Sequence, residues 1–220
     1  MISSPSRLNS GHEVLVIDAR VAINLLGTGR PADLLQMLNR KVLIDELALE
    51  EVTSDPFSKL PGREAMEVLI RSGLISSVRL SAPAFEVFLE LTGATPPDDL
   101  GDGEAATLAQ SFDIGAVPVI DERKATRISL SLRPKHPILH TIDILACSAL
   151  TTALPRQELG DLIYAALFHA RMRVPIPCRE WVCALIGPER TRSCPTSALS
   201  GASANGKSDR LADGFQASPD

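Results

Sequence analysis

Two short apolar runs in this chain each end in an aspartate. Residues 14–17 are followed by Asp18, and residues 117–120 are followed by Asp121. Each run has the composition of a buried strand, and a stretch with helical spacing comes after it. In open parallel sheets, ligands bind outside the carboxyl ends of the strands. The two aspartates are therefore candidates for a shared site at that edge of a sheet.

A third acidic cluster, Gly-Asp-Gly-Glu at residues 101–104, lies between the two runs in the sequence. Asp102 is a plausible N-cap for the helix that follows, and Glu104 falls in its first turn, so the two compete for one role. Glu51 ends a short helix and is a weaker candidate, because Glu46 and Glu50 belong to the same acidic stretch.

Several carboxylates close together suit a divalent cation. Crowded carboxylates repel one another, which raises their pKa values until a cation binds. Mg²⁺ takes oxygen ligands and keeps several waters, so a few carboxylates suffice. We therefore expect a divalent cation such as Mg²⁺ among Asp18, Glu51, Asp121 and either Asp102 or Glu104. Of these, we take Asp18, Glu104 and Asp121 as the catalytic residues. The alternative is that each aspartate only caps the helix after it.

Such a site can hydrolyse phosphodiesters, because the cation neutralises developing charge and activates water. Basic residues follow Asp121, and Arg123, Lys124 and Arg127 are candidates for contacting the phosphates of a single-stranded substrate. An equally good interpretation of these three residues is a solvated helix face that balances the local acid.

Other chemistries fit the sequence less well. It has no nucleophile elbow and no P-loop. An aspartyl phosphatase needs a second acid two residues after its nucleophile, where this chain has Arg20. The four cysteines form no C-x-x-C pair, and we interpret them as reduced thiols. His136 and His140 have helical metal-ligand spacing, but Pro137 between them favours surface or strand positions.

Composition places the chain among globular proteins with one main core. It has 220 residues, of which 45% are hydrophobic and 4% aromatic, which suits helices packed on a parallel sheet. The net charge of -5 argues against broad nonspecific binding of nucleic acid, but not against a nuclease. No apolar stretch is long enough for a membrane span, and the start lacks a secretory signal, so we expect a cytoplasmic protein.

Alternating strand and helix patterns predict an α/β fold, a parallel sheet flanked by helices. Further strands are expected at 41–44, 74–80 and 138–141. Because proline donates no ladder hydrogen bond, Pro118 predicts that its strand starts late or lies at an edge. Residues 1–12 are expected to be a loose segment, 13–187 the domain, and 188–220 a disordered tail with few large apolar residues.

The order of these motifs resembles the PIN-domain family, in its bacterial and archaeal toxin-type branch. The similarity rests on 16–19 with 23–26, on 49–52, on 101–109 and on 119–127. It implies a three-layer α/β sandwich and a Mg²⁺- or Mn²⁺-dependent ribonuclease that acts on RNA. It also implies a toxin with a small antitoxin protein as partner, and a homodimer. By position, Asp18, Glu51, Glu104 and Asp121 would form the metal site.

Three residues depart from the family pattern. Arg20 stands where the family commonly has a small hydroxyl residue, Glu122 where this branch often has an aspartate, and Asp143 where it tends to have glycine. An Arg20 guanidinium paired with Asp18 would occupy the place of the cation. The alternative function is therefore a catalytically weakened PIN-like domain that acts as a binding or scaffold subunit.

Overall fold

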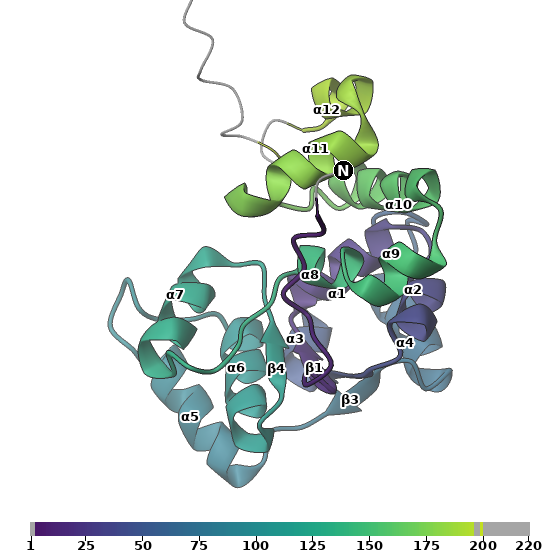
Figure 1. The fold of residues 1–220 in the computed structure, drawn as a ribbon. Coiled ribbons are helices and arrows are strands. Elements are labelled where there is room, and N and C mark those ends of the chain that lie inside the picture. Colours follow the sequence, from purple (N-terminus) through teal and green to yellow (C-terminus); the bar gives the residue numbers. More distant parts are fainter. Residues whose placement is uncertain (1–2, 196–198, 200–220) are drawn as a thin grey trace, which may run out of the picture.

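A four-stranded parallel sheet forms the centre of the molecule (Figure 1). The computed structural model describes residues 3–195 and residue 199. The strands are β1 (Val14–Ile17), β2 (Lys41–Asp45), β3 (Ser76–Val78) and β4 (Val117–Val119), in the order β3-β2-β1-β4. With helices on both faces, this arrangement confirms the predicted three-layer α/β fold.

The two faces of the sheet have separate apolar cores. Leu15 and Ile17 point to one face, where they join a large cluster with helices α1 (Ala19–Gly27), α2 (Pro31–Leu38), α9 (Ser148–Ala153) and α10 (Arg156–His169). Val16 points to the opposite face, as alternation along a strand requires. That face is covered by α6 (Asp102–Ile114), which packs against α5 (Ala82–Thr92). A sheet buried on both sides explains the nearly continuous apolar strands.

The remaining helices extend these layers. They are α3 (Glu46–Glu50), α4 (Gly62–Arg71), α7 (Arg123–Leu132), α8 (Thr141–Leu145), the 3₁₀ turn η1 (Ile176–Cys178), α11 (Arg179–Ile186) and α12 (Pro188–Ser193). In the part of the chain that the structure describes, none of the helices has both the length and the apolar character needed to cross a membrane.

The topological switch point of the sheet lies beside β1: strands β2 and β3 are added on one side of it, and β4 on the other. Strand β1 pairs with β2 on one side and with β4 on the other. At such a switch point, the connections leave opposite faces and a crevice opens at the carboxyl ends of the strands. Asp18 follows β1 directly, and its backbone N–H donates to the carbonyl of Val119 at 3.1 Å. The two strand ends that carry the candidate aspartates are thus adjacent.

Pro118 determines how the sheet ends. It lies inside β4, and β4 is the last strand in the sheet order, as predicted. Residues 138–141 run beside β4 but form only one bridge, between Leu139 and Val119. The carbonyl of Pro118 accepts the Leu139 N–H at 3.0 Å, whereas its nitrogen has nothing to donate. The prediction of a full strand at 138–141 is therefore wrong.

The structure describes parts of the segments before residue 13 and after residue 187. In the segment predicted to be loose, Arg7 is ion-paired with the buried Asp143 at 2.6 Å. At the other end, the chain continues beyond residue 187 as helix α12. Residues 196–198 and 200–220 of the predicted tail lie outside the described residues.

Candidate functional site

A cavity of about 500 Å³ opens at the carboxyl ends of β1 and β4. We call it the acid cavity. Four carboxylates and three guanidinium groups line it: Asp18, Glu104, Asp121, Glu122, Arg20, Arg171 and Arg173. The carboxylates come from β1, α6 and the turn after β4. Three of the four residues predicted as metal ligands, Asp18, Glu104 and Asp121, therefore meet at this edge of the sheet.

Asp18 is a buried carboxyl group of the acid cavity. The residue is only 3% exposed. Its Oδ2 accepts the backbone N–H of Arg20 at 3.2 Å, so it does cap α1 as the alternative interpretation required. Burial, followed by the nearby charge of Glu104, nevertheless raises the pKa of Asp18 from 3.8 to about 7. A cation bound nearby would stabilise the ionised form of Asp18, which burial and the charge of Glu104 disfavour.

Asp121 does not cap the helix that follows it, because Glu122 occupies the N-cap of α7. Both Asp121 oxygens instead face Thr141. Oδ1 accepts the Thr141 N–H at 2.9 Å, and Oδ2 accepts its hydroxyl at 2.5 Å and the Asn24 amide at 2.6 Å. Burial raises the pKa of Asp121, and these donors oppose the rise. The carboxylate is thus fixed in orientation at the lining of the acid cavity.

Glu104 and Glu51 converge on the start of α6. Glu104 reaches back to accept the Gly101 N–H at 3.0 Å, so Gly101 is the N-cap and Asp102 is not. Glu51 accepts the Gly103 N–H at 2.8 Å from the end of α3. Burial, followed by the charge of Glu51 and then Glu122, raises the pKa of Glu104. Glu51 is therefore close to Glu104 but does not line the acid cavity.

The arginines of the acid cavity balance its acidic residues. The Arg20 backbone N–H donates to Asp18, but no ion pair joins the Arg20 guanidinium to Asp18. Arg171 follows α10 with a φ of 54°. Glycine usually occupies this left-handed position after a helix. A backbone conformation that costs Arg energy thus brings its side chain into the acid cavity.

The donor set fits Mg²⁺ or Mn²⁺ in its chemistry. The ligands available are carboxylate oxygens, and Mg²⁺ is often held by only one or two carboxylates plus waters and substrate phosphates. The mutual repulsion of Asp18 and Glu104 is the second indication. Across residues 3–195 and 199, however, no three His, Cys, Asp or Glu side chains are arranged as a complete ligand group. Asp18 and Glu104 are the pair best suited to hold a cation, with Asp121 beside them.

The three basic residues predicted to bind substrate have different surroundings. Arg123 and Arg127 line a second, larger cavity next to the acid cavity. Arg127 is also ion-paired with Asp98 at 2.6 Å, and Lys124 with Asp99 at 3.7 Å. The Arg127 pair is largely in solvent, and Lys124 is about one-third exposed, so both ion pairs are weak.

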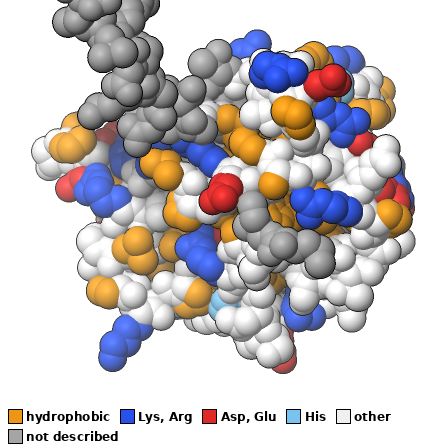
Figure 2. Space-filling view, turned by 45° about the horizontal axis from the view of Figure 1, so that its top comes forward, with side chains coloured by type: hydrophobic (Ala, Val, Ile, Leu, Met, Phe, Trp, Pro, Cys, Tyr) orange, Lys and Arg blue, Asp and Glu red, His pale blue; other side chains and the backbone are white. Residues whose placement is uncertain are grey.

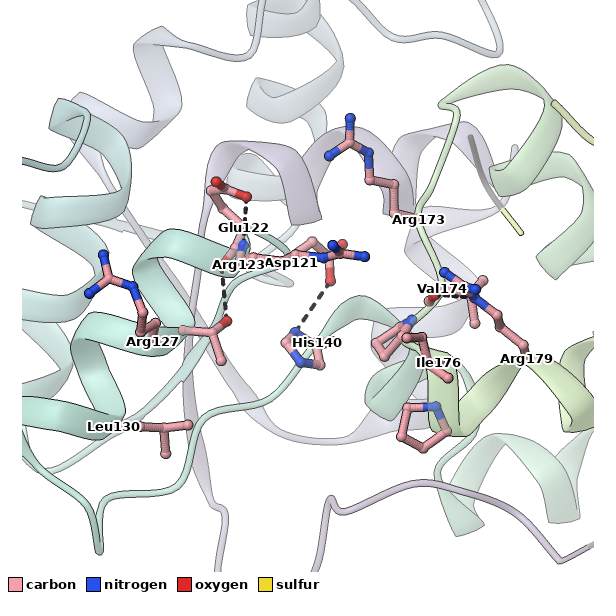
Figure 3. A pocket seen from close by; sticks show the side chains of 13 residues that line it. Asp121, Glu122, Arg123, Arg127, Leu130, His140, Arg173, Val174, Ile176 and Arg179 are labelled. Carbon is pink, nitrogen blue, oxygen red and sulfur yellow. Dashed lines mark hydrogen bonds and ion pairs between the residues drawn. The ribbon is translucent and has the colours of Figure 1, made fainter. Parts of the chain in front are cut away.

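Sequence reasoning missed several residues that surround the two aspartates. His140 was interpreted as a surface or strand residue, but its side chain is 16% exposed and its Nδ1 lies 3.9 Å from Asp121 Oδ1 (Figure 3). The same Nδ1 lies 2.7 Å from the Ile120 carbonyl, which can only accept, so Nδ1 carries a proton. Arg171 and Arg173 belong to no motif that marks them as site residues in the sequence. The positive φ of Arg171 has no signal in the sequence.

Comparisons with known proteins do not assign the chain to a family. No family model matches it, and neither a curated protein nor a solved structure is significantly similar to it.

Proposed function

We propose that this protein is a metal-dependent ribonuclease of the PIN-domain type, which hydrolyses RNA phosphodiesters. The observation that carries the proposal is the acid cavity itself. It gathers carboxylates from three separate elements with three arginines, at the switch point of a parallel sheet. Carboxylates this close together destabilise one another when ionised, and a bound cation relieves that repulsion. The arginines beside them suit an anionic substrate.

In this proposal, the carboxylates and the arginines of the acid cavity have different roles. Asp18 and Glu104 hold the cation, which when bound neutralises charge on the phosphate and activates water. Asp121, oriented by Thr141 and Asn24, completes the acidic surface from the β4 side. The guanidinium groups of Arg20, Arg171 and Arg173 bind the non-bridging phosphate oxygens.

The alternative function, a scaffold without a catalytic metal, depended on Arg20 occupying the place of the cation. The absence of an ion pair between the Arg20 guanidinium and Asp18 favours the enzyme. Asp143, the third departure from the family pattern, also has a structural explanation. It accepts the His140 N–H at 2.8 Å and the Arg7 guanidinium at 2.6 Å, which fixes α8 and the N-terminal segment. Its presence therefore does not argue against catalysis.

Cleavage of a fluorescent single-stranded RNA in Mn²⁺ tests the proposal. Asp18→Asn and Asp121→Asn should each lower the rate at least ~100-fold, as expected when a group that stabilises transition-state charge is removed. Glu90→Gln, on the exposed face of α5, is the matched control and should cleave like wild type. Unchanged cleavage by both aspartate variants would exclude this mechanism.

Arg20→Ser separates the two functions. If Arg20 binds substrate, its removal weakens cleavage; if it blocks the site, its removal increases cleavage and metal affinity. The small antitoxin partner and the homodimer stay predictions from the family resemblance. A neighbouring reading frame for a small protein, and light scattering of the purified chain, test them directly.

A further inference from the structure

A second cavity, of about 820 Å³, adjoins the acid cavity. We call it the Arg179 cavity. It shares Asp121, Glu122 and Arg173 with the acid cavity. In Figure 3, α7 faces the segment 173–179 across this space, with Asp121 and His140 between them. Its volume is in the range of small-molecule sites.

Arg179 is the unusual residue of this cavity. It is only 7% exposed. Its Nε donates to the Val174 carbonyl at 3.2 Å, while its Nη1 is buried without a hydrogen-bond partner among the described residues. No carboxylate in the described part of the chain is ion-paired with it. A buried cation without a counterion is costly, so the site favours an anion.

The position of Arg179 in its helix adds to this imbalance. It is the first residue of α11, where the helix dipole is positive and no side chain caps the helix. Its backbone N–H already donates to the Ile176 carbonyl of the preceding 3₁₀ turn. Glu180 is the acidic residue of the first turn of α11, but it is exposed and not paired with Arg179. An anion beside Arg179 would therefore be stabilised by the guanidinium and by the helix dipole.

The walls of the Arg179 cavity combine basic and apolar groups. Four arginines but only two carboxylates line it. Ile176 is 68% exposed and Leu130 is 46% exposed, on opposite sides of the cavity. Pro175 and Pro177 flank Ile176 and restrict its backbone. Figure 2 shows the same mixture more widely, with Lys and Arg side chains interspersed among hydrophobic ones on one face.

We propose that the Arg179 cavity is a nucleotide subsite. Arg179 binds the phosphate, and the base lies between the apolar side chains of Leu130 and Ile176. Because base faces stack on apolar surfaces whatever their sequence, the subsite holds a single strand with little base preference. Arg173 lines both cavities, so it lies between this nucleotide and the phosphodiester at the acid cavity. The placement along a strand rests on the proposed ribonuclease function; the nucleotide site itself does not.

Calorimetric titration of the full chain in EDTA tests the subsite without cleavage. The probes are adenosine 5′-monophosphate, adenosine and inorganic phosphate. Wild type should bind the nucleotide at least tenfold more tightly than either fragment. Arg179→Gln should weaken nucleotide and phosphate tenfold or more. Ile176→Ser should weaken the nucleotide about threefold and leave phosphate unchanged. Arg63→Gln, on the exposed surface of α4, should bind like wild type.

Nucleotide binding that is unchanged in Arg179→Gln would overturn the proposal. So would binding of a peptide rich in glutamate and leucine by a chain that does not bind the nucleotide, since that result indicates a protein partner. If Arg179→Gln does not unfold cooperatively, Ile176→Ser and Arg173→Gln decide instead, because both residues are exposed. Equal nucleotide affinity in both of them and wild type would also contradict the subsite.

The subsite proposal and the ribonuclease proposal can be tested independently of each other. Asp18→Asn should lose RNA cleavage but keep nucleotide binding in EDTA. If Asp18→Asn cleaves like wild type while Arg179→Gln loses nucleotide binding, the subsite stands and the ribonuclease does not. If Asp18→Asn is inactive while nucleotide binding is insensitive to Arg179, the reverse holds.

Discussion

Thr141 holds both oxygens of Asp121, through its N–H at 2.9 Å and its hydroxyl at 2.5 Å. The two residues are 20 positions apart in the sequence. Asp121 follows β4, whereas Thr141 begins α8, so this contact joins two connections at the carboxyl edge of the sheet. Together with the Asn24 amide, which donates to Oδ2 at 2.6 Å, it orients the carboxylate at the end of its strand.

Replacing the Thr141 hydroxyl tests this relationship. Thr141→Val should lower the free energy of unfolding by about 1–3 kcal/mol, because a buried carboxylate oxygen loses a charge-assisted hydrogen bond. Thr141→Ser keeps the hydroxyl and should recover much of the loss. Urea denaturation measures both variants. Equal stability of Thr141→Val and wild type would show that the hydroxyl contributes nothing.

Gly103 provides the space that Glu51 occupies. A Cβ built at Gly103 lies 2.8 Å from the Glu51 carboxylate, too close for both to remain. Gly103→Ala should change stability by less than about 1 kcal/mol, because the gain in helix propensity offsets one lost hydrogen bond. It should nevertheless displace Glu51 and weaken Mn²⁺ binding, measured by titration. In the Glu51→Ala background, Gly103→Ala should leave Mn²⁺ affinity unchanged, and a further loss there would contradict the displacement.

Asp18 predicts a pH dependence of stability in the metal-free protein. Its pKa rises from 3.8 to about 7 on folding, so the unfolded chain ionises first as pH increases. The favourable contribution of protonated Asp18 is complete below about pH 4 and is lost as pH rises through about 7. Since one pKa unit corresponds to about 1.4 kcal/mol, the loss is on the order of 4 kcal/mol.

Denaturation of wild type and Asp18→Asn between pH 4 and 8 in EDTA measures this effect. Asn does not ionise, so the variant should become progressively more stable than wild type as pH increases. Glu90→Gln should follow the wild-type curve. A stability difference between Asp18→Asn and wild type that does not change with pH would show that Asp18 has an ordinary pKa.

Arg7 fastens the N-terminal segment to the buried Asp143. The Arg7 side chain is 52% exposed while that of Asp143 is 1% exposed, so the pair is intermediate between a surface and a buried ion pair. Arg7→Ala should therefore cost about 1–2 kcal/mol. Arg63→Ala breaks an exposed pair with Glu67 and should cost less than about 0.5 kcal/mol. Thermal unfolding of both variants compares them, and equal losses would contradict the anchoring role of Arg7.

Local patterns were enough to predict the fold class and the two aspartate-bearing strand ends. Burial on both faces requires apolar strands, and this signature is readable in residues 14–17 and 117–119 without any partner. Pro118 likewise predicted, from its missing N–H, a strand that starts late or lies at an edge, and the second alternative holds. The sequence did not show that the missing Pro118 N–H would prevent residues 138–141 from pairing as a full strand, because this depends on which segment lies beside the proline.

The sequence by itself thus determined which segments are strands and helices, and which strand ends carry carboxylates. Only the tertiary structure decided the surroundings of those carboxylates. It placed Thr141 against Asp121 and Glu51 against Gly103. It also placed Arg179, which has no ion-pair partner among the described residues, in the adjoining cavity. Helix and strand periodicity depends on neighbours within a few residues of the chain. These contacts instead join residues brought together by the packing of helices on the sheet, and side-chain types alone do not specify the distances that result.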